Sequence, residues 1–169
     1  MASKARRWFK SIFQTALMVL VISVAVDWWR KPVQPLEFAE QPLALLNQKQ
    51  TSLSELSKDR AAVVYFWGSW CGICRHTSPV VQRLHQSGIS VLSVALKSGS
   101  DQEVQAYMRD KSLSFETVND TDGSISAHWQ IAVTPTIVVV KNGKMIHSTT
   151  GLSSYWGLRS RIWLANQIY

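Results

Sequence analysis

The chain has little cysteine, and this scarcity limits what its thiols can do. Only two of its 169 residues are cysteines, Cys71 and Cys74, and they are separated by Gly72 and Ile73. One pair cannot build a scaffold of several disulfide bridges. The loop that this pair would close is so short that loop closure contributes only modestly to stability. A redox-active pair, an inert disulfide or part of a metal site remain as roles.

The chain also lacks the companions that most metal or haem sites need. Haem attachment requires a histidine directly after C-x-x-C, where this chain has Arg75. Tetrahedral zinc needs two further ligands. His76 is too close to the cysteines to be one of a usual second pair. The other histidines show no ligand spacing, and they are His85, His128 and His147. A two-thiolate Cu(I) site needs no other ligand and stays possible, because thiolates suit soft metals. We otherwise predict no metal and no bound cofactor.

Charge is missing from residues 11–26, which are mostly apolar. With the flanking aromatic residues the run reaches about the 20 residues that span a bilayer as a helix. The bracketing residues stand where interfacial aromatic belts occur, and they are Trp8, Phe9, Trp28 and Trp29. We predict a membrane-spanning signal-anchor helix over residues 11–29. A cleaved signal peptide ending near Ala25 and a buried core helix are the alternatives.

The positive charge of the chain is concentrated beside this apolar run. The net charge is +7, and residues 1–31 hold six basic side chains and one acidic one. Such an excess is typical of membrane topology and argues against a nucleic-acid partner. By the positive-inside rule residues 1–10 form a cytoplasmic tail, and the C-terminal part lies on the other side of the membrane.

Proline separates the anchor from a folded domain. Three of the five prolines fall in residues 30–43, which we interpret as a linker. Residues 44–169 are predicted to form one domain, since the chain is 46% hydrophobic and too short for two domains of ordinary size.

The domain begins with alternating strands and helices. Ser52 and Glu55 form a capping-box pattern that opens a short helix after a hairpin over 44–53. Buried strands are predicted at 61–67 and 89–96, where apolar residues run continuously. The connecting helix starts at Cys71 and continues to about Gln86, with Pro79 either bending or ending it. A helix at 101–111, a short strand at 115–118 and a short helix at 123–131 follow.

The end of the domain has the pattern of a hairpin followed by a helix. Asn142-Gly143 is a type I′ turn dipeptide between two β-branched runs over 136–151. The last helix spans 155–168, with Leu158, Ile162 and Trp163 predicted to face the core. Alternation predicts parallel pairing first, and the hairpin adds antiparallel strands. The fold class is therefore α/β, a central mixed sheet flanked by helices.

The position of the cysteines predicts unequal reactivity. Cys71 follows a strand and opens a helix, where free backbone N–H groups and the helix dipole favour an anion. Its pKa should fall below that of a free thiol, which makes the thiolate available. Cys74 lies three residues further and deeper. Cys71 would attack a disulfide of a partner, and Cys74 would then break the mixed disulfide.

A second proline feature precedes the predicted hairpin. Thr134-Pro135 starts a strand that should lie near the cysteines. Only about 5–6% of X–Pro bonds in folded proteins are cis, so the sequence by itself favours a trans bond here.

The segment FWGSWCGICRHTSP, with a proline eight residues after the first cysteine and TPT about sixty residues later, resembles the thioredoxin superfamily. The anchor, the linker and TSLSELSKDRAAVVYFWGSWC resemble its membrane-anchored, periplasm-facing branch. That branch contains thiol-disulfide proteins of cytochrome c maturation and of the suppressor-of-copper-sensitivity type. The second type is the closer resemblance, and copper tolerance and cytochrome c maturation both stay open as roles.

The resemblance implies a thioredoxin-like fold with Cys71 as exposed nucleophile and Cys74 as resolving thiol. It implies a cis Pro135, with Thr134 offering backbone hydrogen bonds to a bound substrate strand. Residues expected to contact substrate are Trp70, Gly72, Ile73, Thr134 and Pro135, and Trp67 is either core or part of the site. Cytosolic thioredoxins have a buried Asp where this chain has Tyr65. The functional Glu that often follows the next strand in the anchored branch is matched only loosely, by Asp101 and Glu103.

Taken together, we expect a thiol-disulfide oxidoreductase anchored in the bacterial inner membrane by one span, with its domain in the periplasm. Its expected partners are protein disulfides and, by resemblance, a transmembrane thiol reductase that supplies electrons for the reducing direction. A Cu(I)-binding dithiol protein, a disulfide-forming oxidant and a purely structural anchored protein are the alternatives.

Overall fold

The computed structural model describes Trp8, residues 11–15, 17, 18, 21, 22 and 25, and residues 30–168. The chain divides into two compact units, residues 1–31 and residues 32–169. The predicted cytoplasmic tail, residues 1–10, lies outside the described residues except for Trp8. The predicted anchor, residues 11–29, is described only in part. Within the described residues, no helix combines the length and the apolar character needed to cross a membrane.

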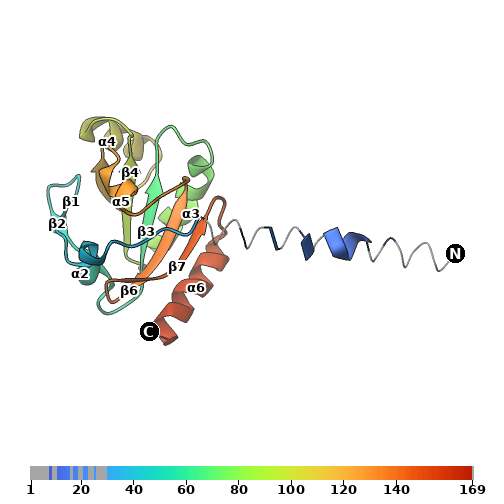
Figure 1. The fold of residues 1–169 in the computed structure, drawn as a ribbon. Helices are drawn as coiled ribbons and strands as arrows, with labels where there is room; N and C mark the ends of the chain where they lie inside the picture. The colour runs from blue at the N-terminus through green and yellow to red at the C-terminus, as the bar shows by residue number, and fades with distance from the viewer. Residues whose placement is uncertain are drawn as a thin grey trace. The chain divides into compact units, whose positions relative to one another are not determined.

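The second unit is built on a five-stranded sheet with the order β5-β4-β3-β6-β7 (Figure 1). The strands are β3 (Ala62–Trp67), β4 (Val91–Leu96), β5 (Glu116–Asp120), β6 (Thr136–Lys141) and β7 (Lys144–Thr150). The pairs β3–β4 and β4–β5 are parallel, whereas β3–β6 and β6–β7 are antiparallel. The predicted mixed sheet is confirmed, and its strand β3 is buried throughout because both of its faces are covered.

Helices cover both faces of this sheet. The elements are η1 (Leu36–Ala39), α2 (Leu53–Ser57), α3 (Cys74–Gln86), α4 (Asp101–Asp110), α5 (Ser124–His128) and α6 (Tyr155–Ile168). Alternate residues of β3 point to opposite faces: Tyr65 and Trp67 share a cluster with residues of α3, α4 and α6. Phe66 lies in the other cluster, with Phe38 of η1 and Trp129 after α5. The cysteines belong to the first cluster, which we call the disulfide face.

Several local predictions are confirmed. The small hairpin pairs β1 (Leu43–Ala44) with β2 (Gln50–Thr51), and the Ser52 hydroxyl accepts the Glu55 N–H to start α2. Pro79 lies inside α3 without ending it. The β6–β7 turn has φ of 51° at Asn142 and 73° at Gly143, which a type I′ turn requires.

Two expectations differ from the structure. The segment 30–43 was expected to be a linker, but the compact unit already begins at Pro32. Val33 donates its N–H to the Trp129 carbonyl at 3.0 Å, and Phe38 is buried in η1. The side chain of Gln34 hydrogen-bonds to the backbone of Gly143 and Met145. These contacts are non-local, so proline content alone could not predict them.

The prediction that Trp163 faces the core is wrong, because Trp163 is 62% exposed. The buried residues of α6 are Leu158, Ile162 and Ala165, which recur at the spacing of one helix face. Trp163 lies about 100° around the helix from Ile162. The small residue Ala165 takes the inward position instead.

Candidate functional site

The two cysteines form a disulfide at the start of α3. Their Cα atoms lie 5.2 Å apart. Cys71 stands in the turn between β3 and α3, and Cys74 is the first residue of the helix. The sequence placed the helix start at Cys71, and the structure moves it three residues later. Before the helix, residues 68–71 form a turn in which the Cys71 N–H donates to the Gly68 carbonyl at 3.1 Å.

The sulfur of Cys71 takes the place of a helix cap. The backbone N–H of Cys74 donates to Cys71 Sγ at 3.1 Å. This N–H belongs to the first turn of α3, where backbone donors have no partner within the helix. The helix dipole adds to the same preference for negative charge. In the reduced protein we therefore expect a lowered pKa for Cys71, as the sequence predicts.

The two cysteines differ in access, although Cys71 is less exposed than expected. Cys71 is 6% exposed in the disulfide form and Cys74 is fully buried. The expectation of an openly exposed nucleophile is wrong for this form, because the carbonyl oxygen of Thr134 lies 3.6 Å from Cys71 Sγ. The order of access, with Cys71 outside and Cys74 inside, agrees with the roles of attacking and resolving thiol.

An exposed apolar rim adjoins the disulfide in the sequence. Trp70 is 57% exposed and Ile73 is 49% exposed, and Gly72 between the cysteines has open space where a Cβ would stand. Trp70 is held in place because its Nε1–H donates to the Leu96 carbonyl at 3.0 Å. Its ring lies on Gly68, where a Cβ atom would stand 2.6 Å from Trp70 Cε2. The rim can therefore contact a substrate without rearrangement.

The loop that follows β4 supports the loop that carries the first cysteine. Ser69 N–H donates to Ser98 Oγ at 3.0 Å, and Ser98 Oγ–H donates to the Leu96 carbonyl at 3.1 Å. Ser98 was not predicted from the sequence as a supporting residue. The sequence did contain a signal for this contact. Parallel strands bring the loops at their carboxyl ends to the same edge of a sheet, so the loop after β4 was expected to lie near the loop after β3.

The Thr134-Pro135 peptide bond is cis. The trans bond favoured by base rate is wrong, and the cis bond implied by the thioredoxin resemblance is confirmed. The bond is framed by backbone contacts, since Gly151 N–H donates to the Pro135 carbonyl at 2.9 Å. The fold thus places this segment beside Cys71, 63 residues away in the chain.

Two aromatic residues of β3 lie in the disulfide-face cluster, and both are fully buried. The Tyr65 hydroxyl hydrogen-bonds with Ser78 Oγ at 2.9 Å, and Ser78 stands one helical turn after Cys74. Burial, the largest influence, raises the pKa of Tyr65 above its usual range, so this position is uncharged at neutral pH. Trp67 is core, and its Nε1–H donates to Ser93 Oγ at 3.0 Å.

The two carboxylates considered near the second strand serve the start of α4. Glu103 and Ser100 form a capping box, and hydrogen bonds from the Ser100 backbone and side chain lower the pKa of Glu103. The Asp101 carboxylate accepts from Asn119 Nδ2 at 2.8 Å. Both carboxylates therefore have hydrogen-bond partners at the start of α4. Among the contacts of the described residues, neither of them hydrogen-bonds to Cys74, so neither is assigned as the proton acceptor for Cys74.

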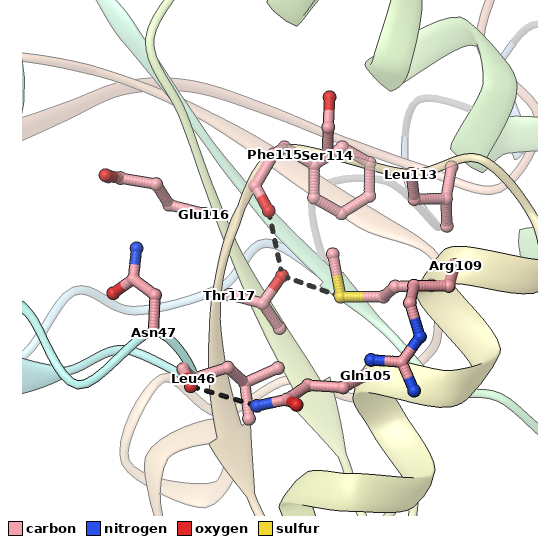
Figure 2. Close-up of a pocket in the computed structure, with 10 residues that line it drawn as sticks. Leu46, Asn47, Gln105, Arg109, Leu113, Ser114, Phe115, Glu116 and Thr117 are labelled. Atoms are coloured by element: carbon pink, nitrogen blue, oxygen red, sulfur yellow. Dashed lines mark hydrogen bonds between the residues drawn. The ribbon is translucent and has the colours of Figure 1, made fainter.

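A separate hollow of about 390 Å³ lies between α4, β5 and the β1–β2 turn (Figure 2). Gln105 spans it by donating to the Leu46 carbonyl at 3.0 Å, and the Thr117 hydroxyl donates toward Met108 Sδ at 3.3 Å. None of the predicted site residues lines this hollow. In the part of the chain that is described, no three His, Cys, Asp or Glu side chains gather as a metal site.

Known structures share this architecture. A secreted disulfide oxidoreductase of Mycobacterium tuberculosis, homologous to E. coli DsbE, superimposes with a TM-score of 0.64 at 21% identity, covering 77% of this chain and 99% of that one. A putative thioredoxin of Neisseria meningitidis gives a TM-score of 0.66 at 23% identity, covering 76% and 88%. At these identities the likeness establishes the fold.

Sequence relatives extend the likeness to chemistry. A thioredoxin-like protein of Haemophilus influenzae is 42% identical over 162 residues, which are 96% of this chain and 97% of that protein. The thiol-disulfide oxidoreductase ResA of Bacillus subtilis is 29% identical over 109 residues. That match covers 62% of this chain and 60% of ResA, so it is restricted to the region of the domain.

A thioredoxin-like sheet with the Cys71–Cys74 disulfide at the start of a helix and a neighbouring cis-proline, together with the sequence relatives, defines the class as a thiol-disulfide oxidoreductase. The sequence pattern of the AhpC/TSA family matches residues 36–148, and the chain belongs to this family.

Proposed function

We propose that this protein reduces disulfides of partner proteins on the periplasmic side of the bacterial inner membrane. The observation that carries the proposal is the hydrogen bond from Cys74 N–H to Cys71 Sγ, which offers a thiolate a donor at the start of α3. The nearly buried Cys71 and the fully buried Cys74 then act in sequence.

The reaction has two exchange steps. The Cys71 thiolate attacks one sulfur of the partner disulfide, and the other partner sulfur leaves as a thiolate that takes up a proton. Cys74 loses its proton and attacks Cys71 Sγ, which releases the second partner thiol. The partner gains two electrons, and the protein ends with the Cys71–Cys74 disulfide. A dithiol donor must reduce that disulfide again, and we assign this task to a transmembrane thiol reductase.

Location and direction rest on the amino-terminal sequence and on the resemblance. The apolar run over 11–29, with the heavier positive charge before it, supports an anchor that leaves the domain outside the cytoplasm. The resemblance to the suppressor-of-copper-sensitivity type supports the reducing direction and a role in copper tolerance. The cysteine pair serves as the redox centre without a further cofactor.

The test traps the intermediate. In Cys74→Ser the first exchange proceeds and the second cannot, so a mixed disulfide through Cys71 accumulates and partners can be identified after non-reducing electrophoresis. Cys71→Ser is the matched control and should trap nothing. A Cys71→Ser variant that still reduces a protein disulfide at the wild-type rate would refute the mechanism.

The resting redox state decides the direction. Alkylation of thiols in intact cells should find the wild-type pair mostly reduced if the protein is a reductase. A mostly oxidised pair would instead indicate an oxidant that installs disulfides. High-affinity, stoichiometric Cu(I) binding with negligible disulfide exchange would indicate a copper-binding dithiol protein.

A further inference from the structure

Helix α6 is apolar on two sides. Its inner side is buried through Leu158, Ile162 and Ala165. Its outer side carries large apolar residues that are 49–70% exposed, namely Trp156, Trp163, Leu164 and Ile168. At about 100° per residue these four fall within one arc of roughly 140° on the solvent side. We call this set the outer face of α6. Exposed apolar groups gathered in this way mark interaction surfaces.

Cationic side chains flank the outer face. Residues 123–169 contain no Asp or Glu, while they contain four Lys or Arg residues. Arg159 and Arg161 belong to α6 itself and are exposed. Arg60 adds a third cation, since it lines the same surface hollow as Arg159 and Trp163. An apolar face with cationic neighbours complements a surface that is apolar inside and anionic outside.

The tether to the membrane is shorter than the sequence indicates. The domain begins at Pro32, which is buried, and residues 33 and 34 are hydrogen-bonded to it. If residues 11–29 span the bilayer, as the proposed function holds, only Arg30 and Lys31 separate the span from the domain. Two such residues bridge about 10 Å, a reach that brings the domain surface within range of the lipid headgroups.

We propose that the outer face of α6 lies on the anionic lipid surface of the membrane that anchors the chain, with Trp156 and Trp163 at the level of the headgroups. Tryptophan is enriched at this level of the bilayer. Helices with an apolar face and cationic flanks bind in the plane of the interface. A second copy of the chain fits less well, because two cationic outer faces would repel each other.

The experiment uses the full chain, labelled with 5-fluorotryptophan and reconstituted in lipid nanodiscs. Variants Trp156→Phe and Trp163→Phe assign the two fluorine signals. With phosphatidylglycerol and a headgroup spin label in the disc, both signals should broaden severalfold. The signals of the buried Trp67 and Trp129 should stay sharp, and their unchanged shifts show that the fold is intact.

A charge variant tests the recognition of anionic lipid. For the full chain in phosphatidylglycerol discs, each of Arg159→Gln and Arg161→Gln should weaken the binding of the outer face, read as loss of the broadening, about fivefold. The matched control is Lys49→Gln with Arg109→Gln, which removes two exposed cations outside α6 and should leave the broadening unchanged. Arg109 lines the hollow of Figure 2.

Three results would overturn the proposal. They are no broadening in anionic discs, equal broadening in phosphatidylcholine discs, or broadening that depends on protein concentration alone, which would indicate a second copy. This inference rests on the proposed anchor, and carbonate extraction separates the two. A chain that resists extraction but shows no broadening loses the docking surface and keeps the anchor. A chain released by carbonate loses the anchor, and broadening on vesicles to which it is added still decides the docking.

Discussion

Replacing the buried Tyr65 by phenylalanine should change how stability depends on pH. Tyr65 is fully buried and its hydroxyl hydrogen-bonds with Ser78 Oγ at 2.9 Å. Burial is the main cause that raises its pKa, the bond with Ser78 opposes it, and Tyr107 adds a smaller increase. In the unfolded chain the same group titrates near its ordinary pKa of about 10.

The sign and size follow from proton linkage. Above pH 10 the native protein keeps the Tyr65 proton and the unfolded chain loses it, so the native state binds more protons and stability falls as pH rises. For one group this loss is about 1.4 kcal/mol per pH unit. The stability that Tyr65 contributes is fully present below the pKa of the tyrosine in the unfolded chain. In Tyr65→Phe it is absent, so the stability curve should be flatter above pH 10.

The two curves should therefore cross. At neutral pH Tyr65→Phe should be less stable by about 0.5–1.5 kcal/mol, because a buried hydrogen bond is lost. At about 1.4 kcal/mol per pH unit, the wild type loses this advantage near pH 11. Above the crossing the variant should be the more stable protein.

Urea denaturation at a series of pH values, followed by tryptophan fluorescence with the disulfide intact, measures stability against pH for the wild type and for Tyr65→Phe. Unchanged m-values check that the unfolded state is the same in both proteins. Tyr155→Phe is the control of opposite sign. Hydrogen bonding with Ser87, the largest cause, lowers the pKa of Tyr155, so its own contribution to stability grows with pH. If Tyr65→Phe keeps the slope of the wild type, the hydroxyl is not sealed in the core and the reasoning fails.

Two further substitutions test the support of the site. Ser93→Ala should destabilise the domain by about 1–3 kcal/mol in urea denaturation, because the buried Trp67 N–H loses its acceptor; a change like that of an exposed site, below about 0.5 kcal/mol, would contradict this. Gly68→Ala should slow disulfide exchange severalfold while the midpoint of denaturation changes little, because the new Cβ displaces the exposed Trp70 ring. Wild-type exchange rates in Gly68→Ala would show that the position of Trp70 does not matter for substrate.

The thioredoxin-like class was predictable because its signals are local or nearly so. A continuous apolar run made β3, Ser52 started α2, and Asn142-Gly143 made the hairpin turn, each through the chemistry of a few adjacent residues. The C-x-x-C spacing brought Cys71 and Cys74 within reach of each other on either side of the α3 start. The unequal access of the two thiols followed from the same geometry.

Supporting residues were harder to predict, since each depends on a neighbour far away in the chain. Ser98 holds Ser69 across two parallel strands, and Ser78 meets Tyr65 between helix and sheet. Hydroxyl side chains occur throughout a sequence. Only the arrangement of the elements selects the few that have a partner.

The sequence by itself determined the elements, the redox pair and the class of chemistry, because short-range backbone preferences and apolar periodicity act within one segment. Tertiary structure decided that residues 32–43 lie on the domain, that Trp163 faces outward, and that Pro135 is cis beside Cys71. Those outcomes depend on which surfaces meet, and the free energy of such meetings is shared among residues that are distant along the chain.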